Sequence, residues 1–146
     1  EVESGVRLVS AGRLDKDSEG LILFSNDGAF IDKLTHPRYR IRKIYEVSLE
    51  RPLSEADMAR FAEGIQDSGE TLKAESIEQT GESKYRLILA EGKNREIRRM
   101  VEAVRNRTKR LKRVGVGNLK LGGLDVGEWK YLSGKEAESA LAEIRK

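Results

Sequence analysis

Residues 12–28 form the most informative stretch of the sequence, GRLDKDSEGLILFSNDG, in which a polar loop runs directly into an apolar segment. Asp15 lies in the loop, and residues 20–25 follow with four successive large apolar side chains, a pattern that predicts a buried strand. A turn at 26–28 comes next, and its Asp27 is suited to cap a short helix. The stretch therefore predicts one carboxylate, that of Asp15, presented on a loop that feeds a buried strand.

Length and composition restrict the classes of function that the chain can perform. With 146 residues, of which 38% are hydrophobic and 36% charged, the chain can form one domain with a core and a densely ionic surface. The absence of cysteine excludes disulfides, thiolate metal sites and a cysteine nucleophile, and a single histidine argues against a histidine-based metal cluster or triad. No apolar run approaches the roughly 18 residues of a membrane span, and no secretory signal is present. We therefore expect a cytoplasmic protein with no metal site and no membrane association.

Positive charge is concentrated in one segment. The chain as a whole carries a net charge of +3, but residues 93–113 contain ten basic residues and only two acidic ones, Glu96 and Glu102. Such a concentration is typical of a surface that binds a polyanion such as nucleic acid. A solvated basic face with no ligand is the alternative that this pattern leaves open.

The order of the expected elements predicts the fold class. We expect strands over residues 20–25, 44–49, 71–79, 85–90 and 111–124, with helices after Asp27, after Ser54, from Asn94 and after Ser133. In the third helix the apolar residues recur at helical spacing, which indicates a face packed on a core. This order predicts an α+β fold with a mixed, mostly antiparallel central sheet and flanking helices.

Three segments together resemble a known enzyme family. They are the stretch around Asp15, the KIYEV segment at 43–47 and the EGKNREIRRM segment at 91–100, with a weaker fourth match over residues 111–129. The combination resembles the pseudouridine synthases that modify ribosomal RNA. The resemblance implies that residues 1–146 form one catalytic domain that lacks its N-terminal portion and has no separate N-terminal RNA-binding domain in this chain.

The resemblance implies a reaction and a set of catalytic residues. The reaction detaches uracil from its ribose, turns it and rejoins it through carbon, and it needs no cofactor because no redox change occurs. Asp15 would be the nucleophile, attacking either the base or the sugar. Lys93 is the first candidate for the cation that pairs with Asp15, and Arg95 is the second. Tyr45 would pack against the flipped-out base and take the proton lost at carbon, and Ile97 would close the other side of the pocket.

Several basic side chains are candidates for binding the RNA backbone. Contacts to phosphates position an RNA without reading its sequence, and the arginine side chains suited to this role are Arg13, Arg95, Arg98 and Arg99. Two of the expected site residues have competing interpretations, since Lys93 could contact a phosphate and Ile97 lies on the apolar stripe of its helix. Glu96 departs from the family pattern, which has glutamine at that position.

Two other functions remain as alternatives. The first is a non-catalytic RNA-binding or ribosome-assembly module, which would not need Asp15, Tyr45 and Lys93 together. The second is a DNA-binding protein, which the absence of a helix-turn-helix pattern disfavours. We expect a ribosomal RNA stem-loop as the partner and a monomeric chain, with dimerisation through an exposed sheet edge as the alternative if the sheet is incomplete.

Overall fold

A six-stranded sheet forms the centre of the protein. The computed structural model describes residues 9–10, 14–93 and 95–121. The strand order is β10-β9-β4-β8-β7, with all these neighbours antiparallel, and β2 pairs in parallel with β9. The bounds are β2 (Glu19–Gly20), β4 (Lys43–Leu49), β7 (Ser76–Gly81), β8 (Lys84–Leu89), β9 (Thr108–Val116) and β10 (Leu119–Lys120). The mixed, mostly antiparallel sheet that the sequence predicts is confirmed.

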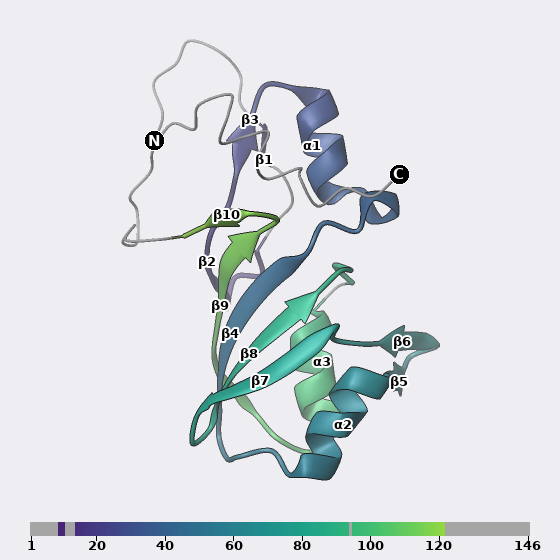
Figure 1. Ribbon diagram of the computed structural model, residues 1–146, viewed down its shortest axis with the longest axis vertical. Coiled ribbons are helices and arrows are strands. Elements are labelled where there is room, and N and C mark those ends of the chain that lie inside the picture. The colour runs from purple at the N-terminus through teal and green to yellow at the C-terminus, as the bar shows by residue number, and fades with distance from the viewer. Residues whose placement is uncertain (1–8, 11–13, 94, 122–146) are drawn as a thin grey trace.

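Two short antiparallel strand pairs and the helices complete the described part of the chain. Strand β1 (Val9–Ser10) pairs with β3 (Phe24–Ser25), and β5 (Ile65–Asp67) pairs with β6 (Glu70–Leu72). The helices are α1 (Gly28–Thr35), the short 3-10 helix η1 (Pro37–Tyr39), α2 (Glu55–Glu63) and α3 (Glu96–Ala103). Figure 1 shows α2, α3 and the β5–β6 pair together beside one half of the sheet, and α1 with β1 and β3 at the other end.

Side-chain caps begin two of the helices where the sequence predicts them. Asp27 accepts hydrogen bonds from the backbone N–H groups of Ala29 and Phe30, at 3.0 and 3.3 Å. Ser54 accepts one from the N–H of Asp57 at 3.1 Å. Each bond satisfies a donor that the first turn of a helix leaves free, which is why the chain turns helical at these points.

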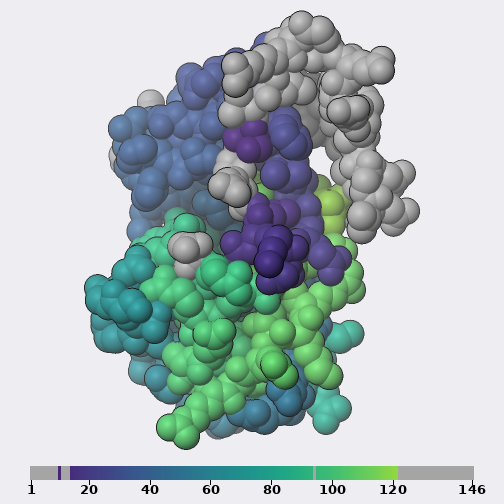
Figure 2. Space-filling model, turned by 180° about the vertical axis from the view of Figure 1, so that it is seen from behind, coloured from purple at the N-terminus to yellow at the C-terminus, as the bar shows by residue number. Residues whose placement is uncertain are grey.

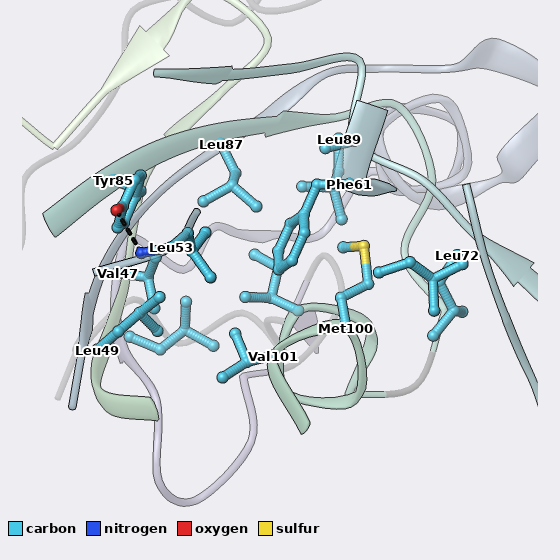
Figure 3. Close-up of a cluster of buried hydrophobic side chains, with 14 residues drawn as sticks. Val47, Leu49, Leu53, Phe61, Leu72, Tyr85, Leu87, Leu89, Met100 and Val101 are labelled. Atoms are coloured by element: carbon cyan, nitrogen blue, oxygen red, sulfur yellow. Dashed lines mark hydrogen bonds between the residues drawn. The ribbon is translucent and has the colours of Figure 1, made fainter. Parts of the chain in front are cut away.

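The main core lies between the sheet and helices α2 and α3. Alternate residues of β4 and β8 face inward toward Met100 and Val101 of α3, as Figure 3 shows, and Leu111 of β9 belongs to the same core. Tyr85 is fully buried in this core, and its hydroxyl accepts a hydrogen bond from the N–H of Leu53 at 2.8 Å. The bond gives the one polar atom of this ring a partner, so the large aromatic side chain can be buried at little cost.

Residues 20–25 do not form the continuous buried strand that the sequence predicts. Leu21 and Leu23 are 8% exposed, whereas Ile22 is 36% and Phe24 56% exposed. The chain is extended here, so successive side chains point to opposite sides and only every second one reaches the core. Two-residue strands, β2 and β3, stand at either end of the segment.

Two other expected strands are divided differently in the structure. Residues 70–72 pair with β5 instead of continuing into β7. The strand expected over 111–124 is divided, in its described part up to residue 121, into β9 and β10 with a turn at Gly117. Gly117 has a φ of 58°, which glycine adopts without strain and which reverses the chain. The expected helix after Ser133 lies outside the described residues.

Candidate functional site

Asp15 lies at the start of the short loop that leads to β2. Its carboxylate Oδ2 is 3.6 Å from Nη1 of Arg95, and the two side chains are 30% and 41% exposed. A partly exposed carboxylate on a loop can reach a bound substrate as a nucleophile, and the guanidinium supplies a positive charge next to it. The structure therefore places Arg95, the second candidate from the sequence, beside Asp15.

Lys93, the first candidate, is engaged elsewhere. Its ammonium group donates to the carboxylate of Glu91 and, at 2.6 Å, to the backbone carbonyl of Thr71. Hydrogen bonding to Glu91 raises the pKa of Lys93. The reason for this difference is local: Arg95 has a φ of 51°, in the left-handed region, so the chain turns between Lys93 and the first residue of α3. The prediction that Lys93 pairs with Asp15 is therefore replaced by the Asp15–Arg95 pair.

The loop that follows Asp15 is fixed to α3. The N–H of Ser18 donates to the carbonyl of Asp15 at 2.9 Å, which closes a turn. Arg98 of α3 donates from Nη2 to the carbonyl of Asp17 at 2.6 Å and to the hydroxyl of Ser18 at 3.4 Å. Figure 2 shows the purple N-terminal segment lying against the green surface that α3 and β9 form. Arg98 thus holds the turn that presents Asp15.

The other end of the loop is fixed to β9 by a close backbone approach. Gly20 stands opposite Arg113, has a φ of 116°, and a Cβ at this position would lie 2.0 Å from the Arg113 carbonyl oxygen. The N–H of Leu21 donates to that same oxygen at 2.8 Å, and Nε of Arg113 donates to the Leu21 carbonyl at 2.9 Å. Only glycine fits such an approach. The loop is therefore held by directed hydrogen bonds at both of its ends.

Tyr45 lies in β4 between two neighbouring strands, opposite Leu87 of β8 and Arg113 of β9. A register shift between Ile44 and Tyr45 interrupts the pairing of β4 with β9 at this point. Such irregularities re-aim side chains and are frequent beside functional sites. The Arg113 guanidinium interacts with the phenol hydroxyl of Tyr45.

Burial raises the pKa of the Tyr45 hydroxyl above its usual value. The negative charges of Glu96 and Asp15 act in the same direction, whereas the charge and hydrogen bond of Arg113 oppose them. The net shift is upward, so this phenol is protonated at neutral pH. Asp15 is one of the charges that act on the Tyr45 hydroxyl, and its effect is smaller than those of burial, Arg113 and Glu96.

Arg113 is a functional candidate that the sequence analysis did not single out. It is only 4% exposed, which is unusual for arginine, and its charge acts on both Tyr45 and Lys43. Burial lowers the pKa of Lys43, and the positive charge of Arg113 lowers it further. One signal could have identified Arg113: it takes an inward position, two residues after the buried Leu111, in an alternating strand.

Glu96 is buried beneath the same site. It is 4% exposed, and its two carboxylate oxygens accept the backbone N–H groups of Lys93 and Lys73, both at 3.3 Å. Burial raises the pKa of this carboxyl, and the two backbone hydrogen bonds oppose the rise. Glu96 thus ties the start of α3 to the turn before it and to the chain that leads to β7.

Other sequence-predicted residues have different surroundings. Arg99 donates to Asp67 at 2.7 Å and to Glu70 at 2.8 Å, so it holds the β5–β6 pair and its charge is already matched by two carboxylates. Ile97 is 3% exposed and belongs to the main core, which favours the packing interpretation over a pocket wall. Arg13 lies outside the described residues.

Neither metal ligation nor a membrane span has support in the described residues. Among them, no group of three or more histidine, aspartate or glutamate side chains is arranged to hold a metal ion. The helices described for residues 9–10, 14–93 and 95–121 are all too short or too polar to cross a membrane.

Comparison with known proteins identifies a family. A family model described as RNA pseudouridylate synthase matches residues 2–103. The chain is 35% identical over 140 residues to an uncharacterized RNA pseudouridine synthase from Borreliella burgdorferi, with 96% of this chain and 56% of that protein covered. It is 35% identical over 136 residues to ribosomal small subunit pseudouridine synthase A from Salmonella typhimurium, with 91% and 59% covered.

A solved structure supports the same assignment. The crystal structure of a pseudouridylate synthase aligns with a TM-score of 0.86 at 35% sequence identity, covering 91% of this chain and 59% of that one. The chain thus spans between half and two thirds of the length of these relatives.

Proposed function

Because this chain belongs to the RNA pseudouridylate synthase family, we propose that it isomerises a specific uridine to pseudouridine in ribosomal RNA, with Asp15 as the nucleophile. The observation that carries the proposal is the Asp15–Arg95 ion pair on a loop that Arg98 and the close approach to β9 fix at both ends. The half-buried Tyr45 lies opposite Arg113 in the strand next to β9. A carboxylate that must attack a bound substrate needs a defined position and a charged form, and this arrangement supports both.

The reaction requires no external reactant. The bond between ribose C1′ and N1 of uracil breaks, a new bond forms between C1′ and C5, and the proton at C5 is lost while N1 gains one. Asp15 can form a transient covalent bond to the base or to C1′ and is released when the product forms. Its leaving as a carboxylate is aided by the positive charge of Arg95.

Tyr45 is proposed to support the base through its ring. The uridine must leave its stack to reach Asp15, and an aromatic side chain beside the carboxylate offers a surface for the flipped base. In this proposal the ring of Tyr45 packs against the flipped base, and its phenol is the candidate acceptor of the proton lost at C5.

The basic residues near Asp15 have different roles in this proposal. Arg95 neutralises the nucleophile, and Arg98 holds the loop, with its remaining donor capacity available to an RNA phosphate. Lys93 is proposed to shape the turn before α3 through Glu91 and Thr71. Since Arg99 is paired with Asp67 and Glu70, its guanidinium is proposed to stabilise the fold and not to contact RNA.

The proposal is tested by tritium release from ribosomal RNA labelled at C5 of uracil, prepared from cells that lack the modification. The chain should release tritium, and Asp15→Asn should lower the rate at least about 10³-fold. Glu78→Gln is the control, because Glu78 is an exposed acid on β7, outside the Asp15 loop and outside α3. Binding of the RNA with no release from the unaltered chain would instead support a non-catalytic RNA-binding module.

A further inference from the structure

A groove lies directly beside the Asp15 loop. It has a volume of about 550 Å³, within the roughly 300–1,000 Å³ typical of ligand sites, and runs from the N-terminal end of α3 to the turn that precedes β9. Four arginines line it: Arg95, Arg98, Arg105 and Arg107. Arg95 lines the groove and also pairs with Asp15, so one RNA strand could occupy the groove and reach the nucleophile at the same time.

Two of these arginines are not used by the fold. Arg95 pairs with Asp15 and Arg98 holds Asp17, but Arg105 and Arg107 are exposed. Within the described ranges neither of the latter two makes an ion pair or donates a hydrogen bond from its side chain. Their guanidinium groups are therefore available to an external anion.

The turn that carries Arg105 and Arg107 is rigidly built. The Asn106 side chain accepts the N–H of Arg107 at 2.8 Å and donates to the carbonyl of Arg51 at 2.8 Å. The carbonyl of Arg107 accepts the N–H of Glu50 at 2.9 Å, and the N–H of Asn106 donates to Val101 at 3.0 Å. A ligand would therefore meet a turn that needs no ordering when it binds.

We propose that this groove binds one phosphodiester of the substrate RNA next to the flipped uridine, an inference that rests on the proposed function. Arginine forks match the oxygens of a phosphate, and single-stranded loops are the form of RNA whose backbone can follow such a groove. Three carboxylates, those of Asp17, Glu50 and Glu102, also line it and keep the positive potential local. The groove therefore suits a single phosphate of the RNA backbone.

The first test compares two double variants in binding of the ribosomal RNA fragment and in tritium release. Arg105→Gln/Arg107→Gln should raise KM and the RNA Kd about tenfold. The slope of the logarithm of the RNA association constant against the logarithm of salt concentration should become shallower by about 0.7, the value for one phosphate of a single strand. The rate at saturating RNA should stay unchanged, because Asp15 and Arg95 remain. Lys33→Gln/Lys84→Gln removes two exposed charges outside the groove and outside the basic segment 93–113, and should leave KM and the slope as they are.

A second test locates the phosphate. Neutral methylphosphonate linkages are placed one at a time around the target uridine. The unaltered chain should lose affinity at one position, and the arginine double variant should be insensitive at that same position, because the two changes remove the same contact. Equal sensitivity of both proteins at every linkage would overturn the proposal.

The outcomes separate this proposal from the proposed function. Tritium release with an unchanged KM and salt slope in the arginine variant would overturn the groove while leaving the isomerase in place. Absence of release from the unaltered chain, together with the expected losses of RNA affinity in the variant, would overturn the isomerase and keep the groove as an RNA site. Thermal unfolding of both double variants checks that neither change acts through the fold.

Discussion

The loop that carries Asp15 and the core beneath the sheet are held in place by different interactions. Directed polar contacts from Arg98, Arg110 and Arg113 hold the loop, which is mostly half-buried or exposed. The main core consists of closely packed apolar side chains from the sheet, α2 and α3. The comparison teaches that the position of the nucleophile and the stability of the fold depend on different residues, so changes in the two regions should affect different measurements.

The largest effect on stability is expected from the core. Phe61 of α2 is 1% exposed, and Phe61→Ala should lower the free energy of unfolding by about 3–5 kcal/mol, because it removes buried surface and leaves a cavity. Urea unfolding measures this loss, and tritium release per folded molecule should be retained. Arg60→Ala, on the exposed side of α2, is the control and should change stability by less than about 0.5 kcal/mol. Equal losses in the two variants would show that α2 does not anchor the core.

A smaller loss of stability, with a direct effect on activity, is expected at Gly20. A methyl group in Gly20→Ala would meet the Arg113 carbonyl at 2.0 Å and force a strained φ, so the pairing of β2 with β9 should open. We expect a loss of about 1–3 kcal/mol together with at least about tenfold slower tritium release. Gly28→Ala is the matched control, since a Cβ there meets nothing within 4 Å. Full activity of Gly20→Ala would contradict the view that this contact positions the loop.

Glu96 lies between the loop region and the core, and its contribution to the free energy of unfolding should depend on pH. Its pKa in the folded protein is raised, so its contribution to stability is present below the ordinary glutamate value near 4.5 and is lost as the pH rises through the raised value. Glu96→Gln removes this dependence, so its stability relative to the unaltered chain should improve between acidic and neutral pH. Urea unfolding across that range measures the difference, with the exposed Glu78→Gln as control. Parallel curves of stability against pH for Glu96→Gln and the unaltered chain would contradict a raised pKa at Glu96.

The smallest effect is expected from the pair between Glu19 and Arg110, which join at 2.7 and 2.8 Å near the protein surface. Glu19→Gln should leave the melting temperature nearly unchanged, because exposed ion pairs contribute little. Tritium release should fall less than about threefold, since the Arg98 and Arg113 contacts still hold the loop. A loss as large as that of Gly20→Ala would show that this pair, and not the backbone approach, fixes β2.

The sequence predicted the elements that local patterns determine. The caps at Asp27 and Ser54 and the apolar stripe of α3 each act within a few residues, so their outcome could be inferred from spacing alone. The exact pairing of strands could not be inferred, because residues 70–72 have the same alternating pattern whether they pair with β5 or extend β7.

The partners of the charged residues were less predictable for a physical reason. Arg98 and Arg99 are adjacent in the sequence, but successive helical residues point about 100° apart, so one reaches the loop and the other the β5–β6 pair. Arg95, and not Lys93, pairs with Asp15 because the backbone of Arg95 is in the left-handed region, a conformation that residues other than glycine seldom adopt. Arg113 lies opposite Tyr45 because β4 and β9 pair in a register with a shift next to Tyr45, and this register could not be inferred from the sequence.

The central claim, that Asp15 acts in the chemical step and not in folding or binding, is tested most directly by single-turnover tritium release and RNA affinity measured together on Asp15→Asn. The account predicts that release falls at least about 10³-fold, while the RNA Kd stays within about twofold and the melting temperature stays close to that of the unaltered chain. Release at the unaltered rate, or a loss of release explained wholly by a weaker Kd, would contradict it.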